Sequence, residues 1–333
     1  MLKPGGIKIN FVDRRCPLCG SAQYKIAFSD INRREGLPIT GILVECDECK
    51  MHYLNPIPNG QSLVQIYRNG WADPVTIDPR QVQSVPRIPT GIPLLCSIVR
   101  LFNGLLRGHP HDWPEESGRG RKILDFGCLD GSKLISWYQR GWQVAGIDLN
   151  LKAIEVAKRR FPDGQFWYGD LMELDISERF DFVRADNVIE HLIDPKEYLL
   201  RLVKLLKPGG YLRVYVPNGA ALSTRLFGRY SAVYWMPFHI NFFTKQTLMQ
   251  ILNKAGLSNV VCNTFNPIGS WSWTQRQLLL KPGFNKGHRS RLDKIIRRLS
   301  ILNYPLETVT QWFSMGEEVI GTGQVCFEHT ERN

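Results

Sequence analysis

The chain has 333 residues, of which 43% are hydrophobic, enough for one full α/β domain and a smaller module. No stretch approaches the roughly 18 consecutive apolar residues that span a bilayer, and the N-terminal residues hold no apolar segment typical of a secretory signal. The composition argues against a fibrous or disordered protein, and the sequence predicts a cytoplasmic location. The net charge of +11 favours anionic partners such as a phosphorylated substrate, nucleic acid or a membrane surface.

Three regions follow one another along the chain. Residues 11–60 hold paired cysteines, residues 61–120 form a Pro-rich helical connector, and residues 121–330 alternate between short apolar runs and helical segments. This alternation predicts an α/β fold with a Rossmann-like, seven-stranded sheet and helices on both faces. The predicted strands are 122–126, 143–147, 165–168, 180–185, 210–216, 259–264 and 323–328. The predicted helices include 151–160 and 195–206, and a basic helical insertion, 265–310, precedes the last strand.

Two further segments, 94–106 and 289–302, have apolar residues at helical spacing with basic residues between them. They allow two interpretations. One is a helix packed on the domain with a solvated basic face, and the other is a helix that binds anionic lipid peripherally. The second interpretation suits a lipid-linked glycan or a quinone substrate at the inner face of a membrane.

Four of the eight cysteines form two Cys-x-x-Cys knuckles, Cys16 with Cys19 and Cys46 with Cys49. This spacing supplies four thiolates, the tetrahedral ligand set of a structural zinc site. Because four thiolates leave no open position for a substrate, the sequence predicts structural Zn²⁺ in a zinc-ribbon-like module at 11–60. The alternative is a set of buried or redox-active thiols.

The most informative stretch runs from the strand at 122–126 into a glycine turn that contains Gly127 and Gly131. A helix follows the turn, and the next strand ends at Asp148, whose carboxylate can accept hydrogen bonds from both ribose hydroxyls of a nucleoside. A dinucleotide site requires Gly-x-Gly-x-x-Gly facing a pyrophosphate. Here Asp125 lies at the mouth, and a carboxylate repels pyrophosphate but attracts the ammonium and sulfonium groups of S-adenosylmethionine (SAM). The sequence therefore favours SAM over NAD.

The order of these motifs resembles that of the class I SAM-dependent methyltransferases. The glycine turn is similar to the family's first motif, with Leu129 in place of its second glycine, and the segments around Asp148, Asp170 and Asp186 are similar to the next three. The resemblance covers about residues 120–265 densely. The cofactor-binding residues that it implies are Asp125, Gly127, Cys128, Gly131, Asp148, Leu149, Asp170, Leu171, Asp186 and Asn187.

The segment that begins at His239 and the N-terminal cysteine module resemble the branch that modifies sugars and polysaccharides, including deoxysugar C-methyltransferases. Those enzymes carry Tyr-x-Glu-His where this chain has Met236-Pro237-Phe238-His239, which favours O-methylation over C-methylation. Histidine is the commonest general base near neutral pH, so we expect His239 to be the base and His191 to line the pocket. Some quinone O-methyltransferases bind a metal through Glu-x-x-Glu-His. Asn187 replaces the first of those glutamates, so the sequence does not predict catalytic magnesium.

Three functional hypotheses remain. The first is O-methylation of a sugar or glycan intermediate, nucleotide-linked or lipid-linked. The second is methylation of a quinone-like or other small molecule. The third is a zinc-ribbon protein that binds nucleic acid or methylates RNA. It ranks lower, because Arg33 and Arg34 are the only basic cluster between the knuckles.

Overall fold

The computed structural model describes residues 9–29, 41–63, 118–236, 238–266 and 312–326, together with 271, 274, 275, 295, 309 and 310. Most of the predicted connector (61–120) and of the predicted insertion (265–310) lies outside the described residues. The same holds for the run at 94–106 and, apart from Ile295, for the run at 289–302.

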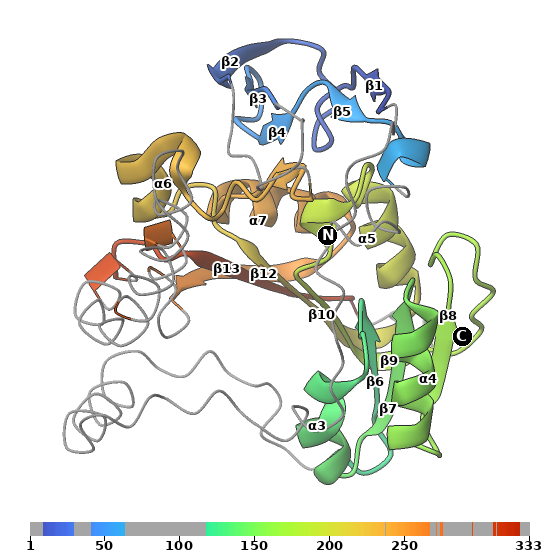
Figure 1. Ribbon diagram of the computed structural model, residues 1–333. Helices are drawn as coiled ribbons and strands as arrows, with labels where there is room; N and C mark the ends of the chain where they lie inside the picture. Colours follow the sequence, from blue (N-terminus) through green and yellow to red (C-terminus); the bar gives the residue numbers. More distant parts are fainter. Residues whose placement is uncertain are drawn as a thin grey trace, which may run out of the picture.

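A seven-stranded sheet forms the centre of the molecule, in the order β12-β13-β10-β9-β6-β7-β8 (Figure 1). The strands from β10 to β8 pair in parallel, whereas β13 runs antiparallel to both β10 and β12. This confirms the predicted Rossmann-like methyltransferase sheet. The strands are β6 (Lys122–Phe126), β7 (Gln143–Asp148), β8 (Gln165–Tyr168), β9 (Phe180–Asp186), β10 (Leu206–Pro217), β12 (Ser258–Phe265) and β13 (Glu318–Gln324).

Two strands differ from their predicted positions. The last strand begins at Glu318, whereas the sequence predicted a start at residue 323. The prediction was late because two inward positions of the strand are Gly321 and Gly323, which hide the alternation of apolar residues. A Cβ at Gly321 would lie 2.6 Å from Leu252, so α7 packs too closely for a side chain there. The predicted turn before residue 210 lies inside β10, where the pairing with β9 shifts register and Gly209 has φ 76°.

Helices cover both faces of the sheet. Ile123 and Phe182 pack with α3 (Ile135–Gln139) and α4 (Leu151–Arg160). Their chain neighbours Leu124 and Val183 pack with α5 (Pro195–Lys204) and α7 (Lys245–Lys254). Because successive strand residues point to opposite faces, the two helix pairs lie on opposite sides. The short helices are η2 (Ser132–Leu134), η3 (Ile189–His191), α6 (Leu222–Phe227) and η4 (Gly228–Tyr230). Among the described helices, none combines the length and apolar character that crossing a bilayer requires.

The N-terminal strands lie beside α5 and α7 (Figure 1). They are β1 (Phe11–Val12), β2 (Tyr24–Phe28), β3 (Leu43–Cys46), β4 (His52–Leu54) and β5 (Ile57–Pro58). Strands β2, β3 and β4 form an antiparallel sheet that is completed by β11 (Asn241–Phe242), a strand from the methyltransferase region. One buried apolar cluster runs from the central sheet through α7 to Leu18, Val44 and Met51. The N-terminal region is therefore packed into the rest of the molecule.

Candidate functional site

The glycine turn after β6 has the backbone that the sequence predicted. Gly127 and Gly131 have φ 78° and 72°, where L side chains are strained. A Cβ at Gly127 would lie 2.4 Å from Val188, and one at Gly131 would lie 2.9 Å from Phe161. Close packing against the protein itself therefore requires both glycines. Leu129, which replaces the family's second glycine, also has a positive φ of 48°.

Asp148 connects this turn to the end of β7. Its Oδ2 accepts a hydrogen bond of 2.8 Å from the Leu129 amide, and its Oδ1 accepts one of 2.8 Å from the Asn150 amide. Burial raises the pKa of Asp148, and these amides oppose the rise. Since each carboxylate oxygen has two lone pairs, both can still accept a ribose hydroxyl. This position fits the predicted nucleoside contact.

Three exposed apolar side chains lie in the segments that follow β6, β7 and β8. Leu149 is 70% exposed, Met172 50% and Leu129 37%, although large apolar side chains usually prefer the interior. The Gly169 amide donates to the Asp148 carbonyl at 3.1 Å, which keeps the end of β8 against the end of β7. These three side chains are suited to contact an adenine ring. Met172 was not among the predicted site residues.

The side chains of three predicted cofactor-binding residues pack or form hydrogen bonds with other residues of the protein. The Cys128 thiol is buried and would lie 2.5 Å from a Cβ at Gly146, so this side chain belongs to the core. Leu171 is also fully buried. Asp170 accepts hydrogen bonds from the Tyr198 hydroxyl at 2.8 and 2.7 Å and from the Met172 amide at 2.9 Å.

Asp125 is the end member of a buried row of charges. Its Oδ1 lies 3.2 Å from Nε of Arg184, and it is 1% exposed. The strand register pairs Asp125 with Arg184 and Arg184 with Arg213. The sequence placed this carboxylate at the mouth of the site, whereas the structure buries it beside Arg184, and burial raises the pKa of Asp125 despite the opposing charge of Arg184. Its Oδ2 has no hydrogen-bond partner in the part of the chain that the structure describes.

Asp186 joins the same group at the end of β9. Arg184 donates to its Oδ2, and Arg213 donates to the same atom at 3.1 Å. Burial opposes ionisation, but the two guanidinium groups lower the pKa of Asp186 overall. Asn187 is exposed, has φ 59° and donates its amide to the Tyr215 carbonyl. Sequence reasoning missed the two arginines, although arginine inside two buried strands is a detectable signal.

The two predicted catalytic histidines lie together, with ring centroids 4.9 Å apart. Nδ1 of His191 donates to the Phe238 carbonyl at 2.9 Å, and Nδ1 of His239 donates to the Val233 carbonyl at 2.9 Å. Because a carbonyl can only accept, the proton is on Nδ1 and Nε2 is the basic nitrogen in each neutral ring. Burial lowers the pKa of His191 to about 4 and that of His239 to about 3.

Glu190 adds a carboxylate that sequence reasoning did not place in the site. Its Oε1 lies 3.7 Å from Nε2 of His191. The side chain is 1% exposed, and neither carboxylate oxygen has a hydrogen-bond partner among the described residues. Burial raises the pKa of Glu190 to about 8, against the opposing charge of Lys133. The segment after β9, which holds Glu190 and His191, thus meets the segment before β11, which holds His239, in one buried polar cluster.

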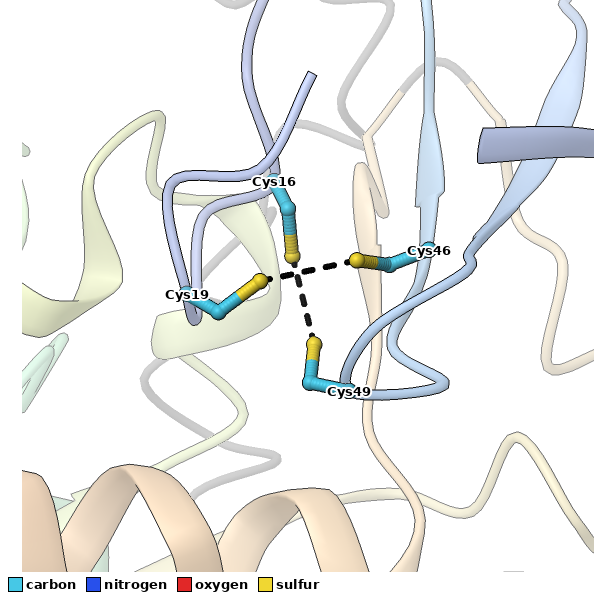
Figure 2. Close-up of side chains that lie close together, drawn as sticks. All are labelled: Cys16, Cys19, Cys46 and Cys49. Carbon is cyan, nitrogen blue, oxygen red and sulfur yellow. Dashed lines mark hydrogen bonds between the residues drawn. The ribbon is translucent and has the colours of Figure 1, made fainter. Parts of the chain in front are cut away.

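The four paired cysteines also converge (Figure 2). Cys16 Sγ lies 3.4 Å from Cys49 Sγ, and Cys19 Sγ lies 3.5 Å from Cys46 Sγ. All four sulfurs are within 4.8 Å of one another. Tetrahedral zinc–sulfur bonds of about 2.3 Å require sulfurs roughly 3.8 Å apart, so the cluster fits a zinc ion. His52 instead pairs with Glu45 at 3.1 Å.

Arg14 connects this cysteine cluster to the histidine pair. Its guanidinium donates to the carbonyls of Leu54, Ile193 and Ile240 at 3.1, 3.1 and 2.6 Å. Ile193 follows His191 by two residues, and Ile240 follows His239 directly. One side chain beside Cys16 therefore holds both segments that carry the histidines.

The chain is similar to several known methyltransferases. A family model described as "Methyltransferase domain" matches residues 101–261. A ubiquinone biosynthesis O-methyltransferase of Cereibacter sphaeroides is 31% identical over 47% of this chain and 68% of its own length. The human mitochondrial ubiquinone biosynthesis O-methyltransferase is 33% identical over 53% of each chain. A crystal structure of a SAM-dependent methyltransferase from Archaeoglobus fulgidus covers 68% of this chain and 94% of that chain, with 20% identity and a TM-score of 0.42.

The sheet order, the glycine turn and these relatives define one class of protein. The chain belongs to the class I SAM-dependent methyltransferases, and it is an enzyme of that class. Its curated relatives named above act in ubiquinone biosynthesis, whereas the sequence favoured a sugar acceptor and kept a quinone-like acceptor as the alternative.

Proposed function

We propose that this enzyme transfers a methyl group from SAM to a hydroxyl oxygen of a quinone-like aromatic acceptor. The observation that carries the proposal is the pair of neutral imidazoles, His191 and His239, beside the end of β9. The names of the relatives at 31% and 33% identity support the acceptor class. The half-buried ring of Trp235, with its centroid 5.4 Å from that of His239, offers flat apolar surface to an aromatic ring.

SAM supplies a methyl group that is already activated by the sulfonium, so the protein's main task is alignment of the nucleophile. Asp148 binds the ribose, and the exposed side chains of Leu129, Leu149 and Met172 contact the adenine. Asp125 directs its Oδ2 to the ammonium group. These roles extend the predicted cofactor site with Met172.

His239 accepts the proton of the acceptor hydroxyl at Nε2. Its Nδ1 is fixed by the Val233 carbonyl, which sets both the tautomer and the direction of the ring. Burial keeps the ring neutral at neutral pH, so its lone pair is present when the acceptor binds. The imidazole of His191, the second ring of the pair, contacts the same hydroxyl group.

We also propose that Cys16, Cys19, Cys46 and Cys49 hold structural zinc. The sulfur positions and the closed four-thiolate set support this role. The ion would stabilise strands β2, β3 and β4, and β4 pairs with β11, the strand that begins two residues after His239.

A sugar hydroxyl is the second candidate acceptor. The feature that favours it is the cysteine module, which resembles the N-terminal module of sugar-modifying methyltransferases and here packs through Arg14 onto the site. The two candidates differ in acceptor chemistry and share the cofactor site and the base.

The test is methyl transfer from labelled SAM to separate pools of hydroxylated quinol analogues, nucleotide sugars and RNA. We expect label in the quinol pool, and His239→Asn should lower kcat about 100-fold while SAM affinity is retained. The matched control is His52→Gln, at a half-buried histidine of β4 that pairs with Glu45. Label confined to sugars would move the assignment to the second candidate, and label confined to RNA would reject both.

A further inference from the structure

Lys133 lies in η2, two residues after Gly131, and its side chain is exposed. Among the described residues, no hydrogen bond or ion pair holds its ammonium group. Two other cations of this edge, Arg184 and Arg213, are by contrast engaged with Asp186. The ammonium group of Lys133 is therefore available to a negative charge that arrives with a ligand.

One guanidinium group places Lys133 beside Asp125. Nε of Arg184 lies 3.2 Å from Oδ1 of Asp125, and Nη1 of Arg184 donates to the Lys133 carbonyl at 3.4 Å. Arg184 is itself buried, so it cannot follow solvent and holds both neighbours in place. The end of β6 and the backbone of η2 therefore contact the same fixed side chain.

The charge of Lys133 also reaches the buried carboxyl groups of this edge. Burial raises the pKa of Asp125, Glu190 and Glu318, and the positive charge of Lys133 opposes that rise for all three. Oδ2 of Asp125 has no hydrogen-bond partner in the described part of the chain. Since a lysine ammonium is a point charge on a flexible four-carbon stem, it can shift along this edge when a ligand enters.

We propose that Lys133 binds the carboxylate at the methionine end of the cofactor, next to Asp125, which binds the ammonium group. The methionine end is a zwitterion, with one positive and one negative group on the same carbon atom. Carboxyl groups alone would attract the first group and repel the second, and the repulsion grows as water is excluded. Lys133 supplies the missing attraction. This role of Lys133 rests on the cofactor site proposed above and is independent of the acceptor.

The experiment compares three ligands by calorimetry on the full-length protein, without acceptor. S-adenosylhomocysteine carries both charged groups, its decarboxylated analogue carries only the amine, and methylthioadenosine carries neither. We expect the wild-type chain to bind S-adenosylhomocysteine about tenfold more tightly than the decarboxylated analogue, because one charge-assisted hydrogen bond is added. Lys133→Gln should abolish this preference and leave the affinity for methylthioadenosine unchanged.

Two further variants are controls. Lys133→Arg keeps the positive charge and should keep the preference. Lys152→Gln removes an exposed lysine from the first turn of α4 and should leave all three affinities unchanged. Equal binding of S-adenosylhomocysteine and its decarboxylated analogue by the wild-type chain would overturn the proposal. A Lys133→Gln variant that weakens all three ligands alike would overturn it too, because such a loss indicates a structural role.

Methylthioadenosine separates this proposal from the proposed cofactor site, since it binds through the nucleoside alone. If it binds the wild-type chain and the preference is absent, the role of Lys133 fails while the cofactor site and the proposed methyl transfer stand. If none of the three ligands binds, the cofactor site itself is rejected, and the role of Lys133 with it.

Discussion

Arg14 donates a hydrogen bond of 2.6 Å from Nη2 to the carbonyl of Ile240, the residue that follows His239. Arg14 lies two residues before the first knuckle cysteine, so this bond joins the predicted zinc module to the predicted base. A second bond, 3.1 Å long, reaches Ile193 after His191. The module therefore holds the two segments that carry the predicted catalytic histidines and does not form a separate unit.

We predict that Arg14→Met lowers kcat about tenfold and the free energy of unfolding by about 2–3 kcal/mol, because several charge-assisted hydrogen bonds are lost. The measurements are steady-state kinetics and urea unfolding. Arg15→Met is the control, since Arg15 is exposed and donates only to the Gly20 carbonyl at 3.3 Å among the bonds that the structure gives it. Equal effects of the two variants would contradict the role of Arg14.

Removal of the cysteine cluster should release zinc and destabilise the N-terminal strands. Cys46 is fully buried, and Cys46→Ser should reduce thiolate-bound zinc from about one ion per chain to none. Because structural zinc in small peptides contributes on the order of 10 kcal/mol, we expect rapid proteolysis within β2–β4. Cys326 lies outside the cluster, so the Cys326→Ser variant should keep about one thiolate-bound zinc ion per chain. Wild-type protein that is purified without zinc and resists chelators would refute this prediction.

Asp148→Ala should weaken SAM binding by about 100-fold or more, measured by calorimetry. The change removes two charge-assisted hydrogen bonds to ribose, each worth roughly 1.5–3 kcal/mol. Asp181→Ala is matched, because Asp181 also accepts a main-chain hydrogen bond, from Lys122 at 2.7 Å, but lies at the amino ends of the strands. Unchanged affinity in Asp148→Ala would remove the basis for the cofactor site.

Arg184→Met should destabilise the protein more at pH 8 than at pH 5. Arg184 and Arg213 hold the pKa of Asp186 below its ordinary value, so Asp186 stabilises the fold above its unfolded pKa of about 4, and this contribution is lost as pH falls. Without Arg184, Asp186 is charged at high pH with Arg213 as its remaining guanidinium partner, and Asp125 loses the cation at 3.2 Å from its Oδ1. The loss at pH 8 should be about 3–5 kcal/mol.

The control for this prediction is Arg179→Met, at the exposed residue just before β9, which should change stability by about 0.5 kcal/mol or less. Denaturant unfolding across pH 5–8 distinguishes the two variants. A loss from Arg184→Met that does not change with pH would show that packing, and not carboxylate charge, is the cause.

Much of the fold was predictable from local pattern. The strand at Lys122–Phe126 and the helix at Leu151–Arg160 have the bounds that the pattern of apolar residues predicted. Asn150 caps this helix by accepting from the Ala153 amide. The last strand was misplaced because Gly321 and Gly323 carry no apolar signal, and only their packing against α7 and Leu257 shows that they point inward.

The sequence by itself determined the order of the motifs, the glycine turn, Asp148 and the two cysteine knuckles, because these depend on residue type at short spacing. The tertiary structure decided which distant residues meet. Arg184 pairs with Asp125 through strand register, the adjacent Glu190 and His191 meet His239 where two segments of the fold come together, and Arg14 reaches Ile240 across the interface. These contacts join residues that lie tens to hundreds of positions apart, so neither periodicity nor local spacing encodes them.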